Sequence, residues 1–244
     1  MNVLVIGGTG GIGLGILEEL SANNDSFHFT YRNETKAKLI AERLKPKSIH
    51  FLDYENEPVK TLEEILNKIE IPDLIILAAG TAYYGSFESM NEKDIHHVLE
   101  VDLNIPILLT NFLVKKMKEK GSGHIHIVSA IAGLLPAVKN MAVYTAAKFG
   151  LIGFVRSVSM ELLGTNVKLS VSAPAGVITG LVENSSGDKE NFEKVIGPLR
   201  KNFDSIQSVG KGILNKLEQR EPVILPTDSS LKFFESSKDR RFWN

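Results

Sequence analysis

Residues 3–13 read VLVIGGTGGIG, a short aliphatic run that ends in a cluster of glycines. Apolar residues at helical spacing follow at Ile12, Ile16, Leu17 and Leu20. The glycines predict a tight turn at Gly7, a close approach of the backbone to a pyrophosphate at Gly11, and close packing of the helix at Gly13. Free N–H groups at the start of such a helix attract phosphate. A nucleotide site is therefore predicted here, although this motif alone also fits a plain glycine-rich loop.

The rest of the chain alternates between short apolar segments and longer segments with helical spacing. Strands are predicted at 3–6, 27–31, 49–52, 74–77, 125–128, 169–173 and 223–225. Two of the helical faces between them contain Leu39, Ile40 and Leu44, and Leu62, Ile65, Leu66 and Ile69. Several strands are apolar throughout, which is typical of parallel sheets that helices cover on both faces. We expect a doubly wound parallel α/β sheet of about seven strands, with residues 1–244 in a single domain.

Composition argues against several classes of protein. The 28 Lys and Arg residues nearly balance the 29 Asp and Glu residues, so charge gives no case for nucleic-acid or membrane-surface partners. The chain has no cysteine, which excludes disulfides and thiolate sites. Its longest apolar run, residues 74–79, is too short to span a bilayer, and the N-terminus lacks the basic start of a signal peptide. We expect a cytoplasmic protein.

A metal site is not expected either. The histidines at 96 and 97 are adjacent on a predicted helix, and those at 124 and 126 share a face of a predicted strand. Neither pair has a carboxylate at the spacing of a metal ligand, so both are interpreted as core or surface histidines.

Three further motifs follow the glycine-rich turn in order. They are Leu77-Ala78-Ala79-Gly80, Tyr144-Thr145-Ala146-Ala147-Lys148 and Pro174-Ala175-Gly176-Val177-Ile178-Thr179. Together with the Gly-x-x-x-Gly-x-Gly spacing at the first turn, they resemble the motifs of the short-chain dehydrogenase/reductase family from residue 1 to about residue 180. This resemblance implies a nicotinamide cofactor and hydride transfer between that cofactor and a small carbonyl compound or secondary alcohol.

The resemblance and the residue chemistry together predict a set of cofactor-binding residues. They are Gly7, Thr9, Gly10, Gly11, Ile12, Gly13, Arg32, Asp53, Ala79, Gly80, Tyr144, Lys148, Pro174, Val177 and Thr179. At the end of the second strand, an acid would bind the 2′-hydroxyl of NAD, whereas a nearby cation would bind the 2′-phosphate of NADP. Arg32 lies there, and no acid precedes Glu34. Arg32 either binds the 2′-phosphate or is simply solvated at the start of a helix; we favour the first and predict NADP(H). Asp53 either lies near the adenine or only forms a turn.

Tyr144 and Lys148 are the predicted catalytic pair. They are four residues apart and share one face of a helix. A nearby ammonium is expected to lower the pKa of the phenol from its ordinary value of about 10. The family resemblance implies that Tyr144 donates a proton to the substrate oxygen and that Lys148 also holds the nicotinamide ribose.

Two other catalytic positions depart from the family pattern. The usual serine aligns with Ala130, and Ser129 lies one position earlier, as either the oxyanion donor or a structural hydroxyl. The usual asparagine aligns with Asp102, which accepts hydrogen bonds and is expected to order a water in the proton relay. Two hypotheses follow: an NADP(H)-dependent carbonyl reductase or the reverse dehydrogenase, and an NADP-binding protein without reductase activity that acts as a regulatory or structural partner.

The sequence also suggests what surrounds the site. Residues 179–204 are predicted to cover the substrate, with a long loop and a mobile helix over 183–204. Tyr83, Tyr84 and Phe87 either line the substrate pocket or only pack a loop. The tail, residues 226–244, contains Phe233, Phe234, Phe242 and Trp243 and is expected to dock on another surface.

A homodimer or homotetramer is expected. In the family that the chain resembles, the helices corresponding to 102–118 and 144–163 pair with their copies across a two-fold axis. Both stretches are apolar on a second face, with Leu108, Leu109, Phe112, Leu113, Phe149, Ile152, Phe154 and Val155.

Overall fold

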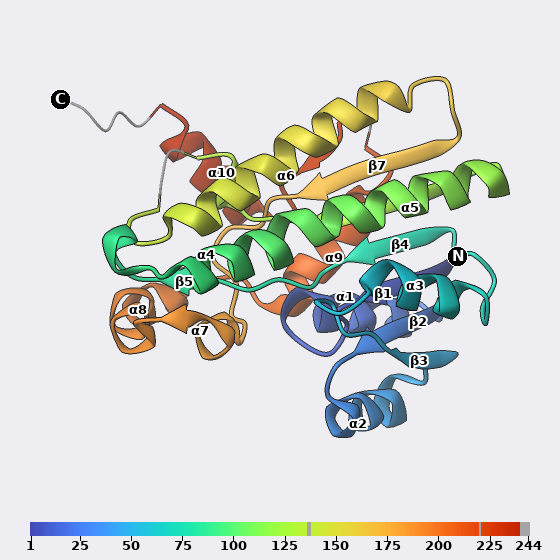
Figure 1. The fold of residues 1–244 in the computed structure, drawn as a ribbon, viewed down its shortest axis with the longest axis horizontal. Coiled ribbons are helices and arrows are strands. Elements are labelled where there is room, and N and C mark those ends of the chain that lie inside the picture. The colour runs from blue at the N-terminus through green and yellow to red at the C-terminus, as the bar shows by residue number, and fades with distance from the viewer. Residues whose placement is uncertain (136–137, 220, 240–244) are drawn as a thin grey trace.

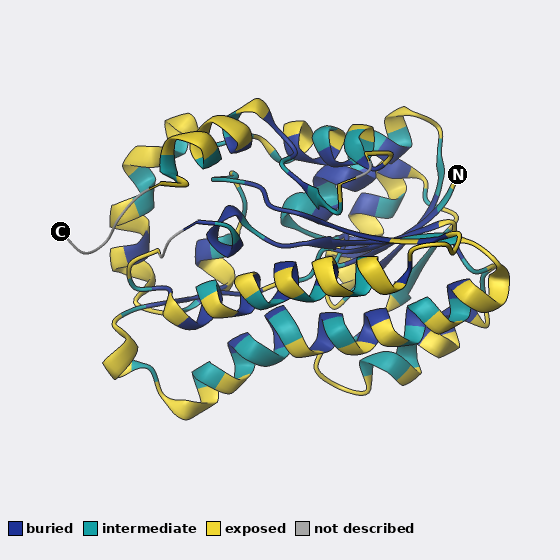
Figure 2. Ribbon diagram, turned by 90° about the horizontal axis from the view of Figure 1, so that it is seen from above, coloured by how far each residue is buried: buried dark blue, intermediate teal, exposed yellow. Residues whose placement is uncertain are grey.

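A computed structural model describes residues 1–135, 138–219 and 221–239. Its main sheet has seven parallel strands between two layers of helices, as Figure 1 and Figure 2 show. In chain order the strands are β1 (Asn2–Ile6), β2 (Ser26–Tyr31), β3 (Ser48–Phe51), β4 (Leu74–Leu77), β6 (Gly123–Val128), β7 (Val167–Ser172) and β9 (Val223–Ile224). Their order in the sheet is β3-β2-β1-β4-β6-β7-β9. The predicted doubly wound fold is confirmed, and all seven predicted strands are present.

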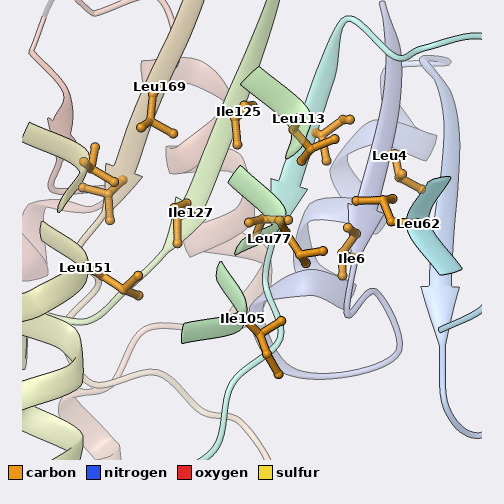
Figure 3. Close-up of a cluster of buried hydrophobic side chains, with 14 of the residues drawn as sticks. Leu4, Ile6, Leu62, Leu77, Ile105, Leu113, Ile125, Ile127, Leu151 and Leu169 are labelled. Carbon is orange, nitrogen blue, oxygen red and sulfur yellow. The ribbon is translucent and has the colours of Figure 1, made fainter. Parts of the chain in front are cut away.

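The strands bury both of their faces. Leu4 and Ile6 of β1 point toward the layer formed by α3 (Pro58–Leu66), α5 (Ile105–Lys120) and α6 (Ala142–Glu161), where Figure 3 shows part of the core. Val3 and Val5 point toward α1 (Gly11–Ala22), α2 (Glu34–Leu44) and α9 (Ile206–Lys216). This two-sided burial explains why the strand segments are apolar throughout.

The glycine-rich turn joins β1 to α1 at the middle of the sheet. β1 pairs with β2 on one side and β4 on the other. Gly7 has a φ of +86°, and a Cβ on it would lie 2.7 Å from the backbone nitrogen of Ala79, just after β4. A Cβ on Gly13 would lie 2.3 Å from the carbonyl oxygen of Gly7. The turn geometry expected at Gly7 and the close packing expected at Gly13 are both observed.

A single helical rod carries Asp102. It runs through α4 (Glu92–Leu99), a π-helical turn η2 (Glu100–Asn104) and α5. Pro106 has no N–H to donate to the carbonyl of residue 102, which favours a wider turn at this point. By length and composition alone, the 29 residues of Glu92–Lys120 could cross a membrane. However, Ile105 and Leu113 belong to the core that covers the sheet (Figure 3).

Residues 183–204, predicted as a long loop with a mobile helix, are more regular than expected, and so is the whole segment 179–204. It contains α7 (Leu181–Asn184), β8 (Ser186–Gly187), α8 (Lys189–Ile196) and a 3-10 helix η4 (Gly197–Asn202). β8 pairs with β5 (Tyr83–Tyr84), and the N–H of Asp188 donates to the carbonyl of Tyr84 at 2.8 Å. Phe192 of α8 is buried against Tyr84. A buried aromatic anchor and backbone pairing to a distant strand therefore order this segment.

The structure corrects several predicted side-chain positions. Leu39 does not belong to the buried face of α2, and Ile69 lies beyond the end of α3. Phe87 is exposed and lines neither of the two cavities described below. Four residues assigned to the second helix faces are instead buried in this chain's own core: Leu109, Leu113, Ile152 and Val155. Helical spacing alone does not distinguish a core face from an interface.

The tail begins with a docked helix, α10 (Asp228–Ser237). Its buried Ser230 accepts a hydrogen bond of 3.1 Å from the N–H of Ala175, in the loop after β7. Phe233 is exposed and Phe234 is half-buried. Phe242 and Trp243, which contributed to the predicted docking of the tail, lie outside the described residues.

Candidate active site

A cavity of about 980 Å³ gathers most of the predicted site residues at the carboxyl ends of the strands. Its lining includes Gly7, Thr9, Gly10, Gly11, Ile12, Arg32, Ala79, Gly80, Ser129, Tyr144, Lys148, Pro174, Val177 and Thr179. Three predicted residues are not part of the lining. Gly13 packs under the glycine-rich turn, Asp53 lies in a turn, and Asp102 lies behind Gly80 and Lys148.

The glycine-rich end of the cavity fits a dinucleotide. No side chain caps the first turn of α1, and no acidic residue lies in it. The first N–H groups of α1 therefore have no side-chain partner, and their partial positive charge can attract an anion. Gly11 has a φ of +51°, and only the side chain of Thr179 comes within 4 Å of the position of a Cβ on it. The backbone can thus approach a phosphate closely.

Two cationic side chains, Arg32 and Lys36, and the carboxylate of Glu55 also line this cavity. Arg32 is exposed, and its guanidinium lies 3.7 Å from Glu55, which also lies 2.9 Å from Nδ1 of His97. Lys36 lines the cavity too, with its Nζ 3.7 Å from the position of a Cβ on Gly10. We did not predict Lys36 from the sequence, although its place four residues after Arg32, in the first turn of α2, was a usable signal.

Asp53 follows the turn alternative. Its Oδ1 accepts a hydrogen bond of 3.2 Å from the N–H of Glu55, and it does not line the cavity. Its neighbour Tyr54 does line the cavity, and its buried hydroxyl has no hydrogen-bond partner among the described residues. Tyr54 was not predicted from the sequence, because an aromatic residue after a strand usually belongs to the core.

Tyr144 and Lys148 lie together on α6, as predicted. Both are buried, and Nζ of Lys148 lies 5.2 Å from the centroid of the Tyr144 ring. The same Nζ lies 3.1 Å from Oδ1 of Asp102, which also accepts a hydrogen bond of 3.0 Å from the N–H of Thr81. A Cβ on Gly80 would lie 3.0 Å from that Oδ1. A side chain at this position would therefore press against the carboxylate of the buried ion pair.

Asp102 changes the electrostatics of the phenol. Burial is the main cause that raises the pKa of Tyr144, and the negative charge of Asp102 raises it further. Burial also raises the pKa of Asp102, while Lys148 and the N–H of Thr81 act in the opposite direction. The expected lowering of the Tyr144 pKa by Lys148 is not seen: burial and the charge of Asp102 raise it, and the ammonium of Lys148 lies 3.1 Å from Oδ1 of Asp102.

Ser129 makes a structural hydrogen bond. Its Oγ donates to the backbone carbonyl of Lys148 at 3.2 Å, and so ties the end of β6 to α6. Ala130 also lines the cavity, but with a methyl group. Of the two readings of Ser129, the geometry favours the structural hydroxyl over the oxyanion donor.

The histidine pairs do not form metal sites among the described residues. His124 and His126 both hydrogen-bond to the hydroxyl of Ser170, at 2.7 and 2.8 Å. Burial lowers the pKa of His126 to about 3 and that of His124 to about 4, as for neutral core histidines. On the surface, His97 contacts Glu55, and His96 lies 3.5 Å from Glu92.

Comparison with known proteins bears on this arrangement. The family model described as "short chain dehydrogenase" matches residues 1–190. A 3-oxoacyl-[acyl-carrier-protein] reductase of Aquifex aeolicus is 30% identical over 219 residues, which are 86% of this chain and 87% of that protein.

Solved structures share the fold. A short-chain dehydrogenase/reductase from Burkholderia phymatum in complex with NAD has a TM-score of 0.85 at 17% identity, covering 96% of this chain and 91% of that one. An alcohol dehydrogenase from Thermococcus sibiricus complexed with 5-hydroxy-NADP has a TM-score of 0.76 at 19% identity, with coverage of 92% and 94%.

The effect of Asp102 on Tyr144 can be tested without a substrate. In Asp102→Asn the acceptor oxygen stays and the negative charge goes, so the pKa of Tyr144 should fall. Phenolate absorbance is titrated in each chain, and the Tyr144 contribution is the difference from the same chain carrying Tyr144→Phe. Asp94→Asn, on the same helical rod, is the matched control. An unchanged or higher pKa in Asp102→Asn would contradict the assignment.

Proposed function

Because the chain belongs to the short-chain dehydrogenase family, we propose that it is an NADP(H)-dependent reductase of a carbonyl compound, or the reverse alcohol dehydrogenase. Membership of the family supports an NAD(P)-dependent oxidoreductase that acts on a small molecule; the preference for NADP(H) and the carbonyl substrate are our proposal. The observation that carries the proposal is the Tyr144 phenol beside Lys148, in the same cavity as the glycine-rich turn. The bound nicotinamide would supply the hydride.

In this proposal each residue has one task. Tyr144 donates the proton of its hydroxyl to the substrate oxygen during reduction and takes it back during oxidation. Lys148 holds the nicotinamide ribose, and Asp102 positions Lys148 through the buried ion pair. Asp102 is thus proposed as a positioning residue, and its expected ordering of a water in the relay stays a prediction. The cofactor-binding set predicted from the sequence is retained, except that Gly13 acts by packing and Asp53 by shaping the turn.

NADP(H) is favoured by two cations near the predicted ribose position. Arg32 and Lys36 both line the cavity beyond the glycine-rich turn. Glu55 lines the cavity as well, but its carboxylate is paired with Arg32 and contacts His97, so its negative charge does not face the cavity alone. A phosphate group would be attracted to such a surface.

The segment 179–204 is proposed as the cover of the substrate site. Leu181, Val182, Phe192 and Ile196 contribute apolar side chains to the cavity, and Arg200 contributes a guanidinium. The cytoplasmic location, and the lack of nucleic-acid and membrane partners expected from the charge balance, stay predictions. A binding protein without reductase activity is the second candidate, since Ala130 gives the site a methyl group where the family has a hydroxyl.

Variants at three residues test the reaction. Tyr144→Phe keeps the ring but removes the proton donor, so kcat with any accepted carbonyl substrate should collapse while NADPH binding survives. Ala130→Ser adds a donor near the developing oxyanion and should raise kcat, by up to about 100-fold. Ser129→Ala should change kcat little if its hydroxyl is structural.

Cofactor binding measured separately by titration completes this experiment. Wild-type turnover in Tyr144→Phe would exclude the proposed proton donor. NADPH binding by every variant with no turnover of any ketone or aldehyde would favour the binding-protein alternative.

Cofactor preference is tested by removing the cations. Arg32→Ala and Lys36→Ala should each weaken the binding of NADPH by about 10- to 100-fold, because each variant loses a charged hydrogen bond to phosphate. The affinity for NADH should be nearly unchanged. Lys38→Ala is the matched control, since Lys38 lies on α2 but pairs with Glu34 outside the cavity. Dissociation constants are measured by fluorescence titration. Equal losses for both cofactors would show that these residues do not read the phosphate.

We also propose assembly through α5 and α6, which Figure 1 shows side by side. Their outer faces leave Leu108, Phe149 and Met160 exposed, and a Cβ on Gly153 would meet open space. Light scattering at micromolar concentration should give two or four times the chain mass of 26.9 kDa. Phe149→Glu should lower that mass, whereas Leu39→Glu, on the exposed side of α2, should not. A monomeric wild-type chain would refute the proposal.

A further inference from the structure

A second cavity, of about 570 Å³, lies at the same end of the molecule. Side chains from segments far apart in the sequence form it: β5, residues 131–135 and 138–141, α8, η4 and α10. The described lining residues are Tyr84, Ile131, Ala132, Leu135, Val138, Lys139, Asn140, Met141, Asn191, Phe192, Val195, Ile196, Leu199, Phe233 and Ser237. Neither the glycine-rich turn nor the Tyr144–Lys148 pair is part of this lining.

The second cavity adjoins the first. Six residues line both of them: Ile131, Ala132, Val138, Met141, Phe192 and Ile196. Phe192 stacks on Tyr84 with ring centroids 4.6 Å apart and planes 5° from parallel, which fixes the wall where the two spaces meet. Tyr144 belongs to the same buried cluster as Phe192 and Met141. The second cavity thus borders the part of the first cavity that contains Tyr144.

The lining selects an apolar occupant. Lys139 is the single charged side chain among the described lining residues. Large apolar side chains also stand exposed there, with Val138, Val195, Leu199 and Phe233 between 41% and 49% accessible. Apolar surface concentrated in a concave site usually marks a ligand-binding groove. Because six residues line both cavities, such a ligand would lie next to a molecule bound at Tyr144.

We propose that the second cavity binds the alkyl or acyl chain of the substrate. The substrate class is then a ketone or aldehyde, or the matching alcohol, with a flexible apolar chain of several carbons beyond the reacting carbon. This inference rests on the proposed function, because it takes the carbonyl group to react at Tyr144. It assigns a chain-binding task to Leu199 and Phe233, which lie outside the first cavity.

Chain length is the first experimental variable. With a series of methyl ketones from butan-2-one to dodecan-2-one, kcat/KM should rise by up to about fourfold per methylene while the chain fills the cavity, and then level off. Leu199→Gln and Phe233→Gln place a polar group in the groove. Each should lower kcat/KM for decan-2-one by about 10-fold and leave that for butan-2-one within about twofold. The affinity for NADPH should not change.

A matched control lies on the same helix as Phe233. Leu231 of α10 is 45% accessible against 49% for Phe233, but it does not line the cavity. Leu231→Gln should therefore leave the whole chain-length profile unchanged. An equal effect of Leu231→Gln and Phe233→Gln would overturn the assignment, since the loss would then come from the helix surface in general.

A binding measurement separates this inference from the proposed function. Calorimetry with decan-2-one, in the presence of NADP, should show binding that Leu199→Gln and Phe233→Gln weaken. If no ketone is reduced but this pattern holds, the reductase proposal fails and the chain site stands. If all ketones are reduced with equal kcat/KM, the reductase proposal stands and the chain site is wrong. Binding of decan-2-one that appears only after removal of residues 240–244 would also overturn it, and would assign the groove to the chain's own terminus.

Discussion

The close approach of Gly7 to the backbone after β4 is the constraint on which the rest of this structure depends. A Cβ on Gly7 would lie 2.7 Å from the nitrogen of Ala79, and one on Gly13 would lie 2.3 Å from the oxygen of Gly7. Larger residues would separate the turn, α1 and the end of β4. The segment after β4 also carries Gly80 and Thr81, which contact Asp102. The glycine-rich turn and the Tyr144–Lys148 pair therefore share one junction, at the point where the helices leave the sheet on opposite sides.

The buried ion pair of Asp102 and Lys148 follows from that junction. Burying two opposite charges costs desolvation energy, so such a pair is weak grounds for stability and better understood as fixing a geometry. Here Oδ1 of Asp102 receives both the ammonium of Lys148 and the N–H of Thr81. The lysine is held beside the ring of Tyr144, but the carboxylate also disfavours the phenolate. Asp102 thus holds Lys148 in place and raises the pKa of Tyr144.

Segments that carry no family motif line much of both cavities. The segment 179–204 is anchored by Phe192 and by the pairing of β8 with β5, and it walls both cavities. The glycine-rich turn and the segment after β2 line one end of the first cavity, whereas α8, η4 and α10 line the second cavity. Such segments can change separately, which is how one fold can host many functions.

The sequence by itself determined the seven strands, the glycine-rich turn and the Tyr144–Lys148 pair. Each is a local pattern: continuous apolar runs, backbone conformations that favour glycine, and a spacing of four on a helix. The tertiary structure alone decided that Ser129 donates to the carbonyl of Lys148 and that Lys36 joins Arg32 at the cavity. It also decided that Leu109 belongs to the core and that α8 and α10 enclose a second cavity. These features depend on distances of a few ångströms between residues far apart in the chain, and local spacing does not encode such distances.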